Sequence, residues 1–309
     1  MTAEEEDTDL DVFDRTEREE VAPKEKVWIP LPHADLLSIE DADELMRWRP
    51  ANVVAIVGER DAGKTTLVAE IYERFLRAPF AGLMFAGSRT LAGFEKRCYL
   101  ARLVSGASAP DTVRTSVQAG LRFFHLGLTS VADRQRFDLL ISERAGESYR
   151  AARNDPSKAS GYLELSKART VVFALDGERI ANDRMREETI SSVRNLIRVA
   201  AETGSVSPQA EVQLVTTKLD WLLPETAAYA LDAVEQFERR MEEGYAHRFA
   251  KFTVWRTAAR GPSSLVEPAF GVAALLQSWL SPPAPTPPAS AAPVLRDEFD
   301  RFLLRGRKG

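Results

Sequence analysis

The sequence has little of what would place it outside the cell or in a membrane. It contains one cysteine, Cys98, which excludes an intrachain disulfide and leaves a packed thiol as the expected role. Its three histidines, His33, His125 and His247, are scattered and indicate no metal cluster. No apolar run approaches the ~20 residues that a membrane-spanning helix needs, and the first residues are acidic, unlike a signal peptide. A cytoplasmic protein is therefore expected.

The chain also has no large excess of charge of one sign. The 309 residues carry a formal net charge of -5, with 28% charged and 44% hydrophobic residues. This balance predicts no general attraction to nucleic acid or to an anionic membrane. The hydrophobic content supports one large α/β domain with tails, or at most two domains.

Both ends of the chain differ in composition from its middle. Residues 1–26 are rich in charge and poor in aliphatic side chains, which predicts a disordered acidic tail. Residues 281–293 are rich in proline and alanine and predict a stiff linker. Residues 294–309 can form an amphipathic helix, which either docks on a partner protein or folds back onto its own domain. The domain itself is expected to span residues 27–280.

Within that domain, apolar strand patterns alternate with helical patterns. Strands are expected at 52–57, 121–128, 136–142, 170–176, 211–217 and 251–256, and helices at 64–77, 91–104, 182–203, 225–246 and 264–280. Ser38 is expected to cap a further short helix that runs through Arg47. This alternation predicts a mostly parallel sheet with helices on both faces. The interval 129–135 is too short for a crossover helix, so the strands on either side of it should form an antiparallel edge hairpin.

The most informative stretch follows the first of these strands and matches the phosphate-loop pattern G-x-x-x-x-G-K-S/T. It reads Gly58-Glu59-Arg60-Asp61-Ala62-Gly63-Lys64-Thr65 and continues into a helix at Thr66. Backbone N–H groups of such a loop surround phosphates, and the helix N-terminus adds its positive end. Lys64 is expected to reach the β- and γ-phosphates, and Thr65 to give its hydroxyl to Mg²⁺.

A second motif, Thr217-Lys218-Leu219-Asp220, ends the fifth expected strand and fits the N/T-K-x-D pattern of guanine-nucleotide-binding proteins. Guanine presents N1–H and a 2-amino group on one edge, and the Asp220 carboxylate can accept from both. Adenine offers an acceptor there and would leave the carboxylate unpaired. The stem of Lys218 can lie along the purine. The sequence thus favours GTP and GDP as ligands.

Two further loops resemble GTPase motifs. Residues Thr257-Ala258-Ala259-Arg260 are similar to the T-S-A-K loop of small GTPases, in which a backbone amide near Ala259 would bind guanine O6. Residues Glu143-Arg144-Ala145-Gly146-Glu147 resemble the D-x-x-G switch, often D-T-A-G-Q. The resemblance implies that Gly146 contacts the γ-phosphate, that Glu143 holds Mg²⁺ through water, and that Glu147 stands where a glutamine orients the attacking water.

Taken together, residues of about 50 to 280 resemble the Ras-like, translation-factor-related (TRAFAC) class of P-loop GTPases, in particular divergent bacterial members. The resemblance implies a three-layer α/β/α sandwich around a six-stranded mixed sheet. It also implies a Mg²⁺-dependent switch that hydrolyses GTP, with Lys64, Gly146 and Glu147 as the catalytic set. Partner proteins are expected to bind its switch regions.

The largest departure from that class is an insertion at about 78–120. It occupies the place of the first switch, whose threonine should ligate Mg²⁺; Thr90, Thr112 and Thr115 are candidates. A catalytic arginine, if the chain supplies one, would come from a second set of candidates: Arg60, Arg89, Arg97 or Arg144.

Two other functions stay open. In a P-loop ATPase, Asp176 at the end of Val171-Val172-Phe173-Ala174-Leu175 would be the Walker B acid. In a pseudo-GTPase, Glu143 and Glu147 would prevent hydrolysis, and the nucleotide would be a structural ligand of a partner-binding module.

Overall fold

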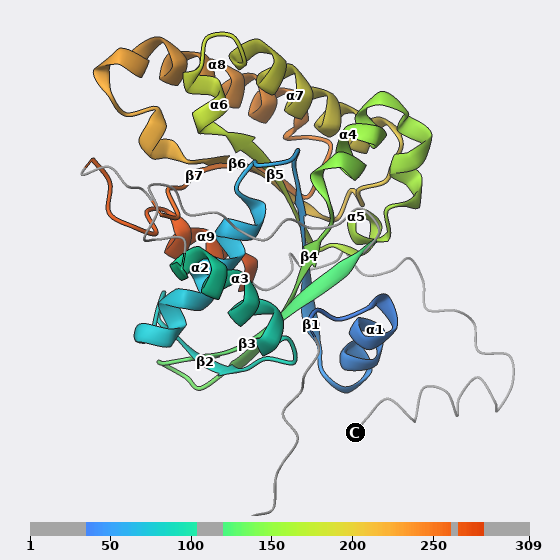
Figure 1. Cartoon of the computed structure of the whole chain (residues 1–309). Coiled ribbons are helices and arrows are strands. Elements are labelled where there is room, and N and C mark those ends of the chain that lie inside the picture. Colours follow the sequence, from blue (N-terminus) through green and yellow to red (C-terminus); the bar gives the residue numbers. More distant parts are fainter. Residues whose placement is uncertain (1–34, 104–119, 261–264, 281–309) are drawn as a thin grey trace, which may run out of the picture. The chain divides into compact units, whose positions relative to one another are not determined.

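The computed structural model describes residues 35–103, 120–260 and 265–280 (Figure 1). The predicted acidic tail, the proline-rich linker and the predicted C-terminal helix lie outside these residues. In the described part, no helix has both the length and the apolar character needed to cross a membrane.

The core of the described structure is one seven-stranded sheet, with strand order β2-β3-β4-β1-β5-β6-β7. Its strands are β1 (Ala51–Val57), β2 (Leu83–Gly87), β3 (Arg122–Ser130), β4 (Arg136–Glu143), β5 (Thr170–Asp176), β6 (Glu211–Thr217) and β7 (Lys251–Arg256). Strands β4, β1, β5, β6 and β7 pair in parallel, whereas β3 is antiparallel to both of its neighbours. The predicted α/β class, the six expected strands and the antiparallel hairpin are confirmed.

The prediction that the hairpin forms the edge of the sheet was wrong. Strand β2 pairs with β3 and lies outside it, so the sheet has seven strands and not six. This strand comes from the insertion at 78–120 and is only five residues long. A short edge strand that ends in glycine leaves too little alternation for the sequence pattern to reveal it.

Helices flank the sheet on both faces. They are α1 (Ile39–Trp48), α2 (Lys64–Arg77), α3 (Leu91–Leu103), α4 (Gly146–Asn154), α5 (Leu163–Lys167), α6 (Gly177–Ala181), α7 (Arg186–Glu202), α8 (Ala228–Tyr245) and α9 (Val272–Leu280). The described residues also include the 3₁₀ turns η3 (Pro156–Gly161), η4 (Leu219–Trp221) and η5 (Glu225–Ala227). Ser38 and Asp41 form the capping box that begins α1. Helices α4, α5 and α6 were not predicted, and α9 begins later than expected, after a turn at Gly271 with φ 73°.

Alternate residues of the strands enter two separate cores. On β1, Val53, Ala55 and Val57 pack with α7 and α8, while Val54 and Ile56 pack with α2, α3 and α9. Figure 1 shows α6, α7 and α8 together on one side of the sheet and α2, α3 and α9 on the other. Two hydrophobic layers hold the sheet rigid, so the loops at the carboxyl ends of its parallel strands have a fixed base.

Candidate nucleotide site

The phosphate loop leaves β1 at Gly58 and enters α2 at Lys64. Asp61 and Gly63 both have positive φ, 65° and 76°, which turns the backbone sharply before the helix. Gly63 caps α2 without a side-chain hydrogen bond, so no side chain of the cap takes up the first N–H groups of the helix. This arrangement, followed by Thr65 and Thr66 in the first turn, suits an anion.

The Lys64 side chain folds back over the loop. Its Nζ donates to the carbonyl oxygens of Gly58, at 2.9 Å, and Glu59, at 2.8 Å. Burial lowers the pKa of the Lys64 ammonium, and the carboxylates of Glu143 and Glu147 oppose that shift. A phosphate group placed here would restore the charge balance of a desolvated cation.

A hydroxyl and a carboxylate meet beside the loop. Thr65 Oγ1 donates a 3.0 Å hydrogen bond to Glu143 Oε1, which is buried at the end of β4. Strand β4 is the direct neighbour of β1, so the two residues face each other at the same edge of the sheet. Hard oxygen donors of this kind are what Mg²⁺ prefers, so these residues fit the metal that the sequence predicted.

Gly146 lies against the phosphate loop at backbone distance. A Cβ atom added to it would lie 2.2 Å from the backbone nitrogen of Arg60 and 2.5 Å from the carbonyl carbon of Glu59. Only glycine fits this approach. Gly146 begins α4, and Glu147 follows it as an exposed residue of the first turn.

The loop expected to bind the base, residues 217–220 (the base loop), is joined to the phosphate loop. Thr217 Oγ1 lies 3.1 Å from the carbonyl oxygen of Ala62 and 3.2 Å from that of Leu175. Lys218 follows with φ 51° and turns the chain so that Asp220 falls in η4. Asp220 is 7% exposed, and burial raises its pKa. A carboxylate held in this way gains from two N–H donors on a ligand.

Residues 257–260, here called the alanine loop, run next to the base loop. Leu219 N donates to the carbonyl of Thr257 at 3.0 Å, which fixes the two loops together. Ala258 N donates to Phe270 O, and the carbonyl of Ala259 accepts from Ala269 N. Arg260 reaches α2, where its guanidinium pairs with Glu70 at 3.4 Å and Glu73 at 3.3 Å. The structure thus brings together the phosphate loop, Glu143, Gly146 and both base-side loops.

The family model for Double-GTPase 2 matches residues 52–280. The chain belongs to the Double-GTPase 2 family. It is thus a divergent GTPase-family domain, and guanine nucleotide is its ligand class.

Several solved structures are similar to this Double-GTPase 2 chain. The GDP-bound Roco2 RocCORdC protein of Methanosarcina barkeri is 15% identical with a TM-score of 0.35, over 74% of this chain and 48% of that one. The signal recognition particle receptor SRb-GTP/SRX complex of Chaetomium thermophilum is 15% identical with a TM-score of 0.40, over 75% and 96%. The Ski7 GTPase-like domain of S. cerevisiae, bound to GDP and inorganic phosphate, is 12% identical with a TM-score of 0.45, over 78% and 51%. The chain thus spans about half of the Roco2 and Ski7 chains. No curated protein matches the sequence.

Of the candidate switch threonines, Thr90 is fully buried and bonded to β3. Its Oγ1 accepts from His125 N at 3.0 Å. His125 pairs with Leu140 in the middle of β4, away from Glu143 at the strand end. Thr90 therefore directly precedes α3 and does not face the phosphate loop. Thr112 and Thr115 lie outside the described residues.

The candidate arginines of the Double-GTPase 2 chain fall into two groups, and two of them are held in structural contacts. Arg144 forms a two-point ion pair with buried Glu164 and stacks on Tyr162. Arg97 pairs with Asp35 and lies over the ring of Phe124. Both are thus structural cations.

The two remaining candidates are exposed. Arg89 N donates to the ring of His125. Arg60 lies on the phosphate loop itself and forms an ion pair with Asp61 at 3.5 Å.

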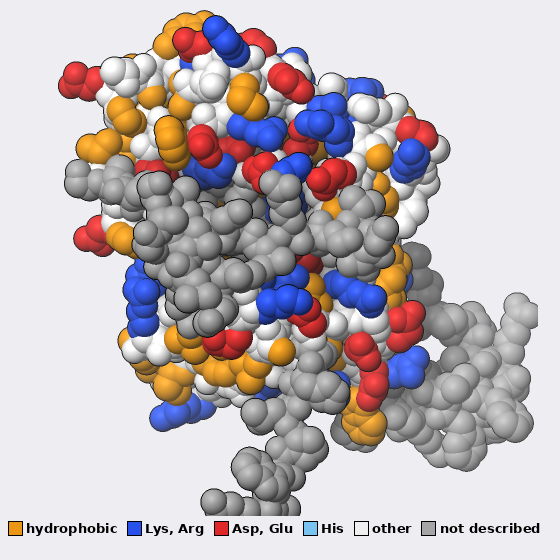
Figure 2. All heavy atoms as spheres, viewed as in Figure 1, with side chains coloured by type: hydrophobic (Ala, Val, Ile, Leu, Met, Phe, Trp, Pro, Cys, Tyr) orange, Lys and Arg blue, Asp and Glu red, His pale blue; other side chains and the backbone are white. Residues whose placement is uncertain are grey.

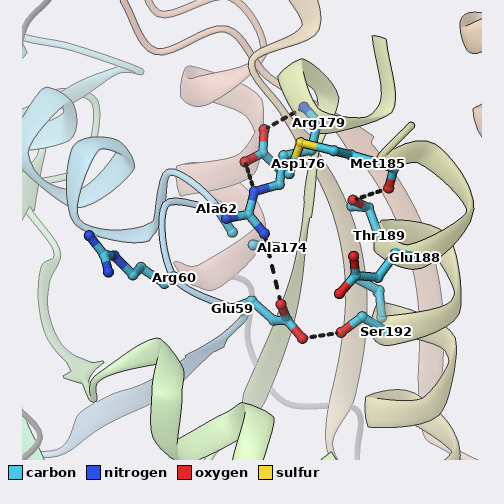
Figure 3. A pocket seen from close by; sticks show the side chains of 11 residues that line it. Glu59, Arg60, Ala62, Ala174, Asp176, Arg179, Met185, Glu188, Thr189 and Ser192 are labelled. Carbon is cyan, nitrogen blue, oxygen red and sulfur yellow. Dashed lines mark hydrogen bonds and ion pairs between the residues drawn. The ribbon is translucent and has the colours of Figure 1, made fainter. Parts of the chain in front are cut away.

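Sequence reasoning missed a polar cluster behind the loop. Glu59 was expected only as a loop residue, yet its carboxylate accepts from Arg150 at 3.0 Å, from Arg153 at 2.7 Å and from Ser192. These donors come from α4 and α7 and are far from Glu59 in sequence. No local spacing signals such a cluster. Figure 3 shows Glu59 and Ser192 hydrogen-bonded to each other in the wall of a small cavity beside α7.

Asp176 was proposed as a Walker B acid in one alternative. The structure places it at the end of β5, where its carboxylate caps α6 and accepts from Lys218 Nζ at 3.1 Å. The partner of the Thr65 hydroxyl is Glu143 and not Asp176.

Proposed function

We propose that this domain is a Mg²⁺-dependent molecular switch that binds GTP and hydrolyses it to GDP and phosphate. The observation that carries the proposal is the Thr65–Glu143 hydrogen bond beside the phosphate loop, because it joins the two oxygen donors that the metal requires. Asp220, held near the loop through Thr217, would select guanine.

Each residue has a distinct part in this proposal. Lys64 and the loop amides would hold the phosphates, and Thr65 and, through water, Glu143 would hold Mg²⁺. When bound, the metal neutralises charge on the β- and γ-phosphates. The N–H of Gly146 would contact the γ-phosphate. Glu147, one residue further on, would orient the attacking water.

The outer face of the domain fits a protein partner better than a polyanion. Figure 2 shows Lys and Arg side chains interspersed with Asp and Glu around α4, α7 and α8. A mixed surface gives specific contacts and no broad field. We expect a partner protein to bind near α4, where the nucleotide state would be sensed.

Single-turnover hydrolysis tests the proposal. Purified protein is mixed with GTP or ATP, with and without Mg²⁺, and phosphate release is followed. We expect release only with GTP and Mg²⁺, at a low rate. Equal binding of ATP would defeat the guanine assignment, while tight GTP binding without release over hours would favour the pseudo-GTPase. Asp220→Asn should shift the preference from guanine to xanthine nucleotides.

The ATPase alternative draws less support from the geometry. Asp176 is occupied as the cap of α6 and as the partner of Lys218. An ATPase would also leave the carboxylate of Asp220 without the donors that guanine supplies.

A further inference from the structure

The Glu59 carboxylate lies where three helices meet the phosphate loop. It is 9% exposed, and it contacts Arg150 and Arg153 of α4, Ser192 of α7 and, at 3.9 Å, Arg179 of α6. Figure 3 shows the carboxylate turned toward Arg179 and Ser192, while Arg60 points the opposite way.

The cluster holds Glu59 in its charged form. Burial raises the pKa of Glu59, but the hydrogen bonds from Ser192 and Arg150 and the charge of Arg153 outweigh it and keep the pKa below its ordinary value. The ion pairs therefore persist through the neutral range.

The cluster also gives α4 a second attachment to the loop. Gly146, Arg150 and Arg153 are spaced four and three residues apart, so they lie on one face of the helix. Gly146 meets the backbone of Glu59 and Arg60, and the two arginines meet the Glu59 side chain. Both attachments are contacts between protein groups.

We propose that Glu59 is a positioning residue that docks α4 on the phosphate loop before any γ-phosphate is bound. The docking itself follows from the contacts above, and only its consequence for GTP rests on the proposed function. If the proposed function holds, docking of α4 places the N–H of Gly146 and the side chain of Glu147 beside the phosphate loop before GTP binds.

The consequence is thermodynamic. A ligand that binds only the docked form loses affinity in proportion to the undocked fraction. Glu59 keeps that fraction small, so it raises the affinity for GTP more than the affinity for GDP, which lacks the γ-phosphate that Gly146 would contact.

Hydrogen exchange at residues 146–154 tests the docking directly. Three proteins are compared without nucleotide and with GDP: the wild type, Glu59→Gln, and the double variant Arg150→Gln/Arg153→Gln. The double variant leaves the phosphate loop itself unchanged. We expect exchange of α4 to rise about tenfold in both variants, and a non-hydrolysable GTP analogue to restore part of the protection.

The matched control is Glu202→Gln, which removes an exposed ion pair with Arg198 within α7. It should leave α4 exchange unchanged. Thermal melting of every variant verifies the fold, and exchange in the sheet should stay slow. If α4 exchanges equally fast in the wild type and both variants, Glu59 does not dock the helix and the proposal fails.

Binding of GDP and of the GTP analogue supplies the second readout. The double arginine variant should lose about tenfold in affinity for the analogue relative to GDP, whereas a merely structural role would weaken both alike. A ratio equal to that of the wild type would overturn the inference. If instead the wild type binds no GTP, the proposed function fails, and the exchange measurement without nucleotide still decides the docking.

Discussion

The Thr217 hydroxyl lies 3.1 Å from the backbone carbonyl oxygen of Ala62, which makes the base loop and the phosphate loop one unit. The two residues are 155 positions apart in the chain. Ala62 belongs to the turn that would cradle phosphate, and Thr217 begins the motif that would recognise the base. The distance between phosphate and base subsites therefore depends on this contact.

Thr217→Val removes the hydroxyl and keeps the shape. The Ala62 carbonyl loses a buried donor, which costs about 1–2 kcal/mol. We expect affinity for GDP and for a GTP analogue to fall by a similar factor, about tenfold, as measured by fluorescent-nucleotide titration. Thr203→Val, which removes the bond from Thr203 Oγ1 to Val199 O at the end of α7, should leave both affinities unchanged. A loss confined to one nucleotide would contradict the role of Thr217 as a spacer.

Glu143→Gln keeps a side chain of the same length but removes its charge. Because Glu143 is buried beside Thr65, its charge would act on the metal at close range. We expect the Mg²⁺ concentration that gives half-maximal GTP hydrolysis to rise about tenfold, measured by metal titration at saturating GTP. Asp232→Asn on the exposed face of α8 serves as control. An unchanged Mg²⁺ requirement would remove Glu143 from the metal site.

Gly146→Ala puts a methyl group where the backbone of Arg60 already lies, 2.2 Å away. The helix α4 must move outward, so we expect a GTP analogue to lose affinity while GDP keeps most of its own. The measure is the ratio of the two dissociation constants. Gly161→Ala is the control, because its added Cβ would meet nothing within 4 Å. An unchanged ratio would show that the γ-phosphate is not sensed through this contact.

The parts of the site that lie in continuous motifs could be predicted from the sequence. Gly58 to Thr65 and Thr217 to Asp220 each follow an apolar strand, and parallel strands place such loops at one edge of a sheet. Glu143 and Gly146 followed from resemblance, and the structure brings both to the loop. The six long strands were predictable because each has a clear apolar pattern.

What could not be predicted depends on contacts between distant segments. The arginines around Glu59 come from α4 and α6, and no spacing in the sequence links them. Arg144 and Arg97 looked like free cations until their partners Glu164 and Asp35 were placed beside them. Thr90 matched a switch threonine by residue type alone, yet its hydroxyl bonds to β3. Local residue type and spacing do not reveal such tertiary partners.

His125, buried in β3, makes the stability of the fold depend on pH. Arg89 N–H donates to its Nδ1, so Nε2 carries the proton and faces Asp138 Oδ1 at 3.0 Å. Burial lowers the pKa of His125 below 6.5, against the opposing effect of Asp138, while Arg136 and Arg89 lower it further. As pH falls through 6.5, the unfolded chain takes up a proton that the folded chain does not, so stability decreases.

We therefore expect the urea midpoint of the wild type to fall between pH 7.5 and pH 5.5, and His125→Gln to flatten that dependence. His247→Gln is the matched control, because it replaces an exposed histidine that lies outside β3. Asp138 does not contribute in this window, since burial raises its pKa but the Arg136 and His125 hydrogen bonds outweigh this and hold it below 3.8. A slope equally steep in His125→Gln would mean that another group titrates, and the buried imidazole would then have no part in the acid sensitivity of the domain.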